Sequence, residues 1–496
     1  MNRIALALTG VAASLATAPA LAVHLSRSGA GQVLIFPYFI ARPSANAAEG
    51  ESNTLISIVN TKLQFKAVKV RILESRNARE LRDINVFLGP WDVWTAAIIP
   101  TATGARLVTN DNTCVTPRNT FSQAGLDTFT NAGYSGVFAD GDSFGAGSAS
   151  LDRTREGYIE VIEMGMVTTP QVQAFIKHGT NSIPANCAAL DTLDPGLASP
   201  NASNVFPAGL TTPTGGLTGR ATIINSALGI NFTYAATALD SWSDSVKYGA
   251  AGSGQPRLGA ASPAVSTIAL ANGDILKQTW ASGRDAVSAV IMRSAVNNEF
   301  ILDTGTASLT DWIVTFPTKR DYIGVATGVT APNPQAPFSS NFGGFGACDE
   351  SLAGSEGYQG FNREGAPLAS VASPFRLCWM SNVIPFGANS LLRAATVAPH
   401  PAAMLTALAG SNTVGGTATS TPSVSQGANG RMTLRFDSAA QRLTPLSSAL
   451  NDSPTANTTL IGLPFISLAV HSYQRAGVIS SYGGVIAPVY EQGLVK

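Results

Sequence analysis

The stretch KAVKVRILES (66–75) decides the fold class of this chain. Its valine and isoleucine residues occupy alternate positions, and the cations Lys69 and Arg71 lie between them. Because successive side chains of a β-strand point to opposite faces, this period of two predicts a strand with one buried face and one face in water. Such strands are typical of antiparallel sheets that are solvated on one side.

Comparable segments recur along the chain. Pro37 within the apolar run 31–40 predicts an edge strand or a bulge, and 53–61 is nearly continuous in its apolar residues, which predicts a buried strand. The turn pair Gly89-Pro90 divides 84–99 into two strands. Further strands are predicted at 155–167, within 285–302, and at 310–320, 430–437 and 460–473, with a hairpin at 219–239.

One helix is predicted over 169–179, where Thr169 can cap, Pro170 suits the first turn and Gly179 suits the exit. Long loops rich in Gly, Ser, Thr, Pro, Asn or Ala are expected at 190–218, 324–350 and 398–429. The pattern predicts a mainly β fold of immunoglobulin-like β-sandwich domains with long Gly/Ser/Thr/Pro-rich loops and a few short helices.

The first 22 residues have the pattern of a signal peptide. Arg3 precedes an apolar run that ends in small residues at Ala20 and Ala22, the A-x-A pattern that signal peptidase accepts. We therefore expect an exported chain that is periplasmic, on the cell surface or extracellular, and that starts near Val23. No later segment offers 18 uninterrupted apolar residues, so no transmembrane helix is expected after cleavage.

The length and composition of the rest restrict the class of protein. Its length predicts more than one domain, which we place at 23–240 and 241–496, the second β-rich and packed on the first. Lys and Arg together number 31, as do Asp and Glu, so no net field attracts nucleic acid. Charged residues make up only 12%, which leaves little repulsion between copies of the chain.

The four cysteines are Cys114, Cys187, Cys348 and Cys378. An even number in an exported chain predicts two disulfides. The pairing Cys114–Cys187 with Cys348–Cys378 is favoured because each pair lies within one half of the chain. A zinc site is the alternative, but no two of these cysteines have a C-x2–4-C spacing.

The segment FADGDSFGAG (138–147) invites a catalytic or a calcium-binding interpretation. Ser143 follows Gly-Asp, as in one esterase superfamily, but no histidine of this chain has an aspartate three residues before it. Asp140 and Asp142 offer oxygens to Ca²⁺, although the complete loop pattern is absent. A plain turn is the favoured interpretation, and calcium binding is left open.

Other candidate sites have simpler explanations. Glu160 and Glu163 resemble a glycosidase pair, but three residues apart on a strand they lie on opposite faces. Asp349 and Glu350 are expected to be solvated loop acids. His178 is expected to interact with the last carbonyls of the predicted helix. The histidines, which show no metal-ligand spacing, are His24, His178, His400 and His471.

Tryptophans are the strongest candidates for a binding surface. Trp91, Trp94 and Trp312 lie in predicted β-segments, and exposed aromatic rings on a sandwich can hold sugars. On a regular strand Trp91 and Trp94 lie on opposite faces, and Trp312 shares its face with Val314 and Phe316. Core packing is therefore the favoured role.

Several blocks together resemble an uncharacterised family of exported and surface proteins of Gram-negative bacteria. The blocks are GQVLIFPYF (31–39), NTLISIVNT (53–61), KAVKVRILES (66–75), DVWTAAI (92–98), TDWIVTFPTKR (310–320) and the closing segment 462–484. The resemblance implies export and one shared architecture, and it carries over no catalytic residues.

These observations favour a non-enzymatic exported surface or extracellular structural protein that associates with copies of itself. The alternative is an extracellular binding module for a glycan or another polymer. The residue patterns indicate neither a catalytic set nor a cofactor.

Overall fold

The structure is a computed structural model of the chain. It describes residues 21–44, 50–117, 128–136, 149–193, 209–303, 305–323, 334–338, 351–352, 358–367, 375–377, 379–386, 391–392, 429–447, 457–474 and 481–495. Strands account for 49% of the structure and are arranged in antiparallel sheets, so the prediction of a mainly β protein is confirmed. The immunoglobulin-like connectivity stays a prediction.

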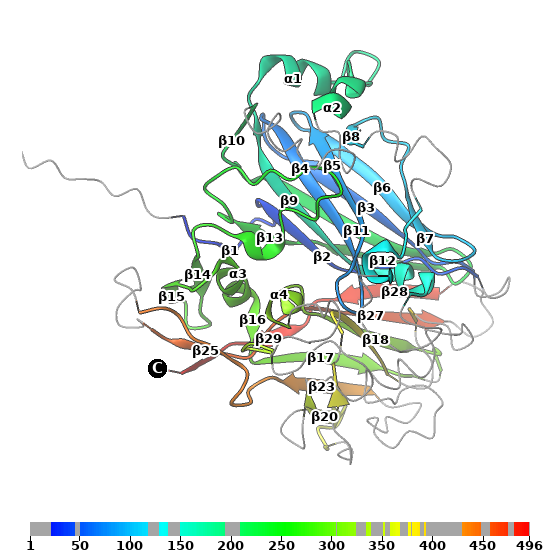
Figure 1. Cartoon of the computed structure of the whole chain (residues 1–496). Helices are drawn as coiled ribbons and strands as arrows, with labels where there is room; N and C mark the ends of the chain where they lie inside the picture. Colours follow the sequence, from blue (N-terminus) through cyan, green and yellow to red (C-terminus); the bar gives the residue numbers. More distant parts are fainter. Residues whose placement is uncertain are drawn as a thin grey trace, which may run out of the picture.

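The largest sheet has eight strands and is built mostly from the first half of the chain (Figure 1). The strand order is β1 (His24–Leu25), β13 (Thr237–Asp240), β2 (Val33–Ile40), β9 (Glu156–Val167), β4 (Phe65–Glu74), β5 (Glu80–Leu88) and β8 (Cys114–Thr116), and β10 (Leu210–Thr211) pairs with β9.

A five-stranded sheet packs against one face of the first. Its order is β12 (Ile230–Ala235), β11 (Leu217–Asn225), β3 (Asn53–Asn60), β6 (Val93–Pro100) and β7 (Ala105–Val108). Val68 and Val70 of β4 and Ile56 and Ile58 of β3 belong to one hydrophobic cluster between the sheets. Burying this apolar surface is the main force that holds the two layers together.

The C-terminal half adds two four-stranded sheets, which lie below the first two in Figure 1. One has the order β22 (Ser381–Phe386), β18 (Leu309–Thr315), β27 (Ile466–Gln474) and β28 (Ser481–Ile486). The other has the order β20 (Tyr358–Asn362), β23 (Asn429–Arg435), β17 (Ala295–Ile301) and β29 (Val489–Glu491). Trp312, Val314 and Phe316 share a core with Met432 and Leu434, as their alternation predicts.

The remaining strands form small sheets. They are β14 (Val265–Ala269) with β15 (Ile275–Thr279), β16 (Met292–Arg293) with β26 (Leu463–Pro464), β19 (Ser351–Leu352) with β21 (Phe375–Arg376), and β24 (Arg442–Leu443) with β25 (Thr459–Ile461) and β30 (Gly493–Val495). The described helices are α1 (Pro170–Ile176), α2 (Cys187–Leu193), α3 (Gly283–Ile291) and α4 (Lys319–Ile323). None of these helices combines the length and the apolarity that crossing a bilayer requires.

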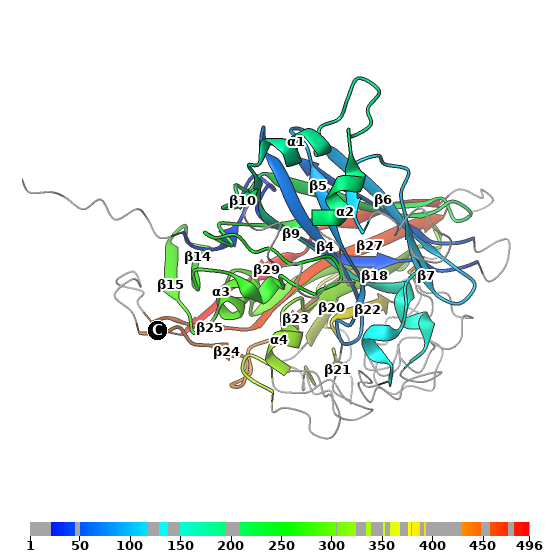
Figure 2. The same ribbon diagram turned by 45° about the horizontal axis from the view of Figure 1, so that its top comes forward.

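The two predicted halves share their cores. Ile313, Val383 and Leu468 from the second half lie in the same hydrophobic cluster as the facing strands of the first half. A further cluster joins Val33 near the N-terminus to Trp242 and Ile466. Figure 2 shows β27 and β18 running alongside the N-terminal strands in a second view.

Strand β2 is central rather than at an edge. It pairs with β13 on one side and β9 on the other, and every residue from Val33 to Ile40 is buried. Of the two positions predicted for Pro37, the bulge is confirmed, because the register with β9 shifts between Phe36 and Phe39. Both hydrogen-bonding edges of β2 are therefore already paired with strands of the same chain.

The predicted wet face of β4 is wrong. The alternation is correct, but Lys69 and Arg71 are buried. A segment 181 residues further along the chain covers Lys69, whose Nζ donates to Ala250 O at 2.9 Å, and Asn85 Nδ2 of β5 donates to Gly249 O at 3.0 Å. Arg71 is enclosed with Leu258 and Arg320. Each of these cations forms an ion pair with a carboxylate, Lys69 with Asp83 and Arg71 with Glu160.

Three further predictions need correction or refinement. The segment β3 is only half buried, because its alternate residues point out of the five-stranded sheet. The strand predicted around Asn297-Asn298 within 285–302 is confirmed as β17, whereas the residues before it form helix α3, where Ser282 Oγ accepts a hydrogen bond from Asp285 N as a helix N-cap. Within 190–218, helix α2 and strands β10 and β11 replace part of the expected loop. Helix α1 and the 219–239 hairpin, with Gly229 in its turn, are confirmed.

Candidate functional site

Trp91 is the exception among the tryptophans of this chain. The other five are buried, among them Trp94 and Trp312, whose predicted core role is confirmed. Trp91 is 61% exposed and lies in the turn before β6, not on a strand. A large exposed aromatic ring on an otherwise well-packed protein is a candidate contact for a ligand.

The backbone at Trp91 adopts a conformation that tryptophan rarely adopts. Pro90 and Trp91 are the central residues of the turn Gly89–Asp92, and Trp91 has a φ of 59°. The third position of a type II turn requires positive φ and usually holds glycine. A side chain with a Cβ costs about 1–2 kcal/mol there. Strain of this kind is concentrated at functional sites.

Hydrogen bonds on several sides fix this turn. The buried Asn60 side chain donates to Gly89 O at 2.7 Å, and Asp92 Oδ2 accepts from Gly89 N at 2.9 Å. Trp91 N donates to Lys62 O at 3.1 Å. The ring of Trp91 is therefore presented by a turn that is organised before any ligand binds.

A groove of about 660 Å³ lies beside Trp91. One wall comes from the turn and the start of β4, and the other from helix α1 and the residues that follow it. The lining residues are Phe65, Gly89, Pro90, Trp91, Asp92, Pro170, Gln173, Ala174, Lys177 and His178. A mainly apolar groove with a few polar groups is typical of sites for small ligands.

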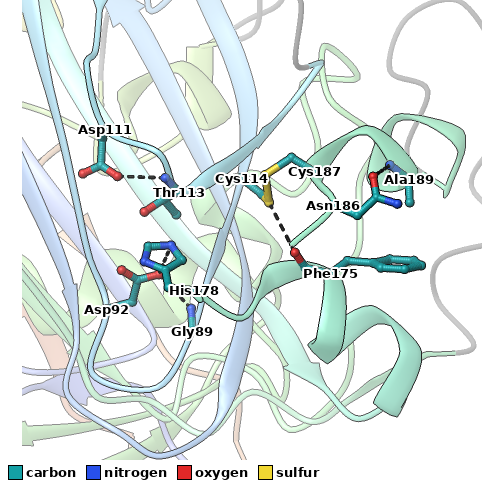
Figure 3. Close-up of a disulfide and its surroundings, with 10 residues drawn as sticks. All are labelled: Gly89, Asp92, Asp111, Thr113, Cys114, Phe175, His178, Asn186, Cys187 and Ala189. Carbon is teal, nitrogen blue, oxygen red and sulfur yellow. Dashed lines mark hydrogen bonds and ion pairs between the residues drawn. A yellow bond between two sulfur atoms is a disulfide. The ribbon is translucent and has the colours of Figure 1, made fainter. Parts of the chain in front are cut away.

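The disulfide Cys114–Cys187 positions the helical wall (Figure 3). Its predicted pairing is confirmed, with a Cα–Cα distance of 5.2 Å, and it ties α2 to edge strand β8 of the large sheet. Val172 and Ile176 of α1 pack with Cys114 in one apolar cluster. The second predicted pair, Cys348–Cys378, lies outside the described residues.

His178 faces the turn and not the helix. Its Nε2 lies 3.7 Å from Asp92 Oδ2, so the predicted interaction with helix carbonyls is wrong (Figure 3). Within the part of the chain that the structure describes, this nitrogen makes no hydrogen bond. This nitrogen is itself buried against Asp92, so the histidine supports the wall of the groove and its Nε2 is not open to a ligand.

Other exposed apolar side chains lie near this end of the molecule. Leu63 is 69% exposed and follows Lys62, whose carbonyl accepts from Trp91. Ile183 is also exposed, and the loop that carries it is closed by a bridge between His178 and Pro184. Neither side chain lines the groove itself.

The carboxylates Glu160 and Glu163 are confirmed to lie on opposite faces of β9. Glu160 Oε2 is 2.6 Å from an Arg71 nitrogen, and Glu163 Oε1 is 2.7 Å from Lys66 Nζ. Burial raises the pKa of both carboxyls and lowers that of Lys66. Each carboxylate is occupied by its own cation, and the two do not form a catalytic pair.

The remaining candidates are dispersed or not described. Asp140, Asp142, Ser143, Asp349, Glu350 and His400 lie outside the described residues. His24 Nδ1 bonds to Ala22 O at 3.1 Å, and the buried His471 Nδ1 bonds to Thr310 Oγ1 at 2.9 Å. Among the residues that are described, no group of three or more His, Cys, Asp or Glu is placed to hold a metal ion.

The sequence reasoning considered Trp91 and His178 separately and did not predict that they share a groove. It missed Phe65, Asp92 and Gln173. The signal that could have found the turn is Gly89-Pro90-Trp91-Asp92, in which a tryptophan occupies a position that favours glycine.

No family model, curated protein or solved structure matches this chain. The resemblance to exported proteins of Gram-negative bacteria therefore stays a prediction, and the function has to be argued from the site.

Proposed function

We propose that this protein is an exported, non-catalytic binding protein whose ligand is a carbohydrate held in the groove beside Trp91. The observation that carries the proposal is the exposed, conformationally strained Trp91 at the mouth of that groove. The flat ring can cover the C–H face of a sugar, which buries apolar area on both partners.

The polar groups around the ring are consistent with this ligand class. Lys177 and Gln173 line the same groove, and Lys177 Nζ and Gln173 Oε1 can form hydrogen bonds with hydroxyl groups at the edge of a sugar. Gln173 Nε2 already donates to Val167 O at 2.8 Å. Asp92 is already used as an acceptor by Gly89 N and Val93 N. Its role is to support the turn.

Replacing Trp91 with glycine tests the proposal. The Trp91→Gly variant is expected to bind the glycan at least about tenfold more weakly, because the stacking surface is lost. It is also expected to be as stable as the wild type or up to about 1 kcal/mol more stable, because glycine adopts positive φ without strain. Trp91→Phe keeps a ring and is expected to retain most of the affinity.

The measurement is a fluorescence titration of the purified protein with a broad panel of polysaccharides, alongside denaturant unfolding. Because five tryptophans are buried, a ligand-induced change should arise mainly from Trp91. Tyr482→Ala, which removes an exposed aromatic ring from β28, is the matched control and should bind like the wild type. A silent panel, or Trp91→Gly binding as tightly as the wild type, would contradict the proposal.

A second candidate function is self-association into a surface structure. One observation favours it: the outer face of the five-stranded sheet exposes Leu55 and Val93, and Thr95, Thr222 and Thr233 lie on the same face. Light scattering on the purified chain is expected to show a mass that rises with concentration. Leu55→Glu should suppress the rise by placing a charge on that face, and Ile275→Glu on the exposed part of β15 is its control. A monomer at all concentrations rejects this candidate.

A further inference from the structure

The folded chain includes residues before Val23. Val23 is fully buried, and Ala22 is 8% exposed. Val23 N donates to Val265 O at 2.9 Å, and Thr267 N donates to Val23 O at the same distance. Val23 therefore continues the line of β1 and pairs with β14 in parallel. The peptide bond between Ala22 and Val23 lies inside this arrangement.

A chain that began at Val23 would place its terminal ammonium group in an apolar environment. Val23 belongs to a cluster with Leu239, Trp242 and Ile268. In the uncleaved chain the Val23 nitrogen has one N–H, and Val265 O accepts it. An ammonium group there would have three N–H donors and a positive charge, and burying these without partners is costly.

Ala22 also makes contacts that cleavage after it would remove. Its carbonyl accepts from His24 Nδ1 at 3.1 Å. Leu21 and Ala22 form part of the wall of a groove of about 840 Å³ that includes Ile275 and Val290. The chain reaches solvent one residue earlier, at Leu21, which is 42% exposed.

The sequence offers two overlapping sites for signal peptidase. Residues 17–23 read TAPALAV, so Ala18-Pro19-Ala20 and Ala20-Leu21-Ala22 both have the A-x-A pattern. We propose that signal peptidase cleaves between Ala20 and Leu21, so that Leu21 is the first residue of the mature protein. This inference rests on the export included in the proposed function, and it changes the cleavage position expected from sequence by two residues.

The first test is the mass of the exported protein. The full chain is expressed with its own leader in a Gram-negative host, and the cell envelope and medium fractions are examined by intact mass and N-terminal sequencing. A start at Leu21 is expected. A start at Val23 overturns the inference but leaves export intact, whereas an uncleaved chain confined to the cytoplasm contradicts export itself.

Two leader variants separate the overlapping motifs. Ala18→Asp disrupts only the first motif, and Ala22→Leu disrupts only the second. Processing is expected to fail or slow in Ala18→Asp and to continue in Ala22→Leu, as read by the mass of the chain. The opposite pattern overturns the inference.

A stability comparison keeps the inference testable if no export is seen. Chains that begin at Leu21 or at Val23 are released from a fusion by a protease that leaves no added residue. The chain beginning at Val23 is expected to unfold at a temperature roughly 5 °C lower. Acetylating its terminal amine, which removes the charge, should restore part of the difference. Equal unfolding temperatures would overturn the argument.

Discussion

Replacing Arg71 with methionine is expected to lower the free energy of unfolding by about 3–5 kcal/mol, the usual cost of removing one partner from a buried ion pair. The Arg71 guanidinium bonds Glu160 at 2.6 Å and Glu80 at 3.3 Å, and its side chain is almost completely buried. Methionine fills similar volume, so the loss reflects mainly carboxylates left without their cation. Denaturant unfolding of both proteins at neutral pH measures it.

An exposed ion pair provides the control for this prediction. Arg435 and Glu491 lie 3.5 Å apart, with both side chains substantially in solvent. Arg435→Met is expected to cost less than about 1 kcal/mol, because water screens and replaces the interaction. If Arg71→Met were no more destabilising than Arg435→Met, the buried pair would not contribute as the structure indicates.

The loss in Arg71→Met is also expected to depend on pH. Burial already raises the pKa of Glu160 in the folded wild type, and Arg71 opposes that rise. Without Arg71 the folded pKa rises further above the unfolded value, so the folded variant binds the proton more tightly than the unfolded chain. The stabilisation from protonation is present at low pH and is lost as pH rises through the folded pKa. The variant should therefore differ less from the wild type near about pH 5 than near about pH 8.

Removing the disulfide is expected to have an effect of similar size. Cys114 and Cys187 are 73 residues apart, and closing a loop of that length restricts the unfolded chain by about 4 kcal/mol in the chain-entropy estimate. The double variant Cys114→Ala/Cys187→Ala should therefore lose about 2–4 kcal/mol of unfolding free energy. Parallel denaturant unfolding of the two oxidised proteins measures the difference.

The same variant should weaken ligand binding in the Trp91 groove, because α1 forms one wall and is anchored through the cluster around Cys114. As a control for effects elsewhere in the chain, a reductant added to the double variant should cause no further loss of ligand affinity. If the unfolding free energy of the double variant fell by less than about 1 kcal/mol, β8 and the helices would hold together without the disulfide.

Local sequence patterns predicted much of the fold. The alternation in β4, β18 and β23 marked strands correctly, because the period of two is a property of the strand itself. Thr169-Pro170 predicted the start of α1, and the separation of Glu160 from Glu163 followed from the same strand geometry. The strand around Asn297-Asn298 was predicted correctly, but helix α3 before it was not predicted, because its apolar residues suit either a helix or a strand and the Ser282 cap was overlooked.

The sequence alone determined which residues alternate, which segments are strands and where turns such as Gly89–Asp92 interrupt them, since these depend on neighbours along the chain. Only the tertiary structure decided which faces meet water. Lys69 is buried because residues 249–254 return to cover it, and Arg71 is enclosed with Arg257, Leu258 and Arg320. Trp91 and His178 share a groove because the disulfide and the sheet bring α1 beside the turn. Alternation along a strand shows which residues share a face, but the packing of distant segments decides whether the opposite, polar face also becomes buried.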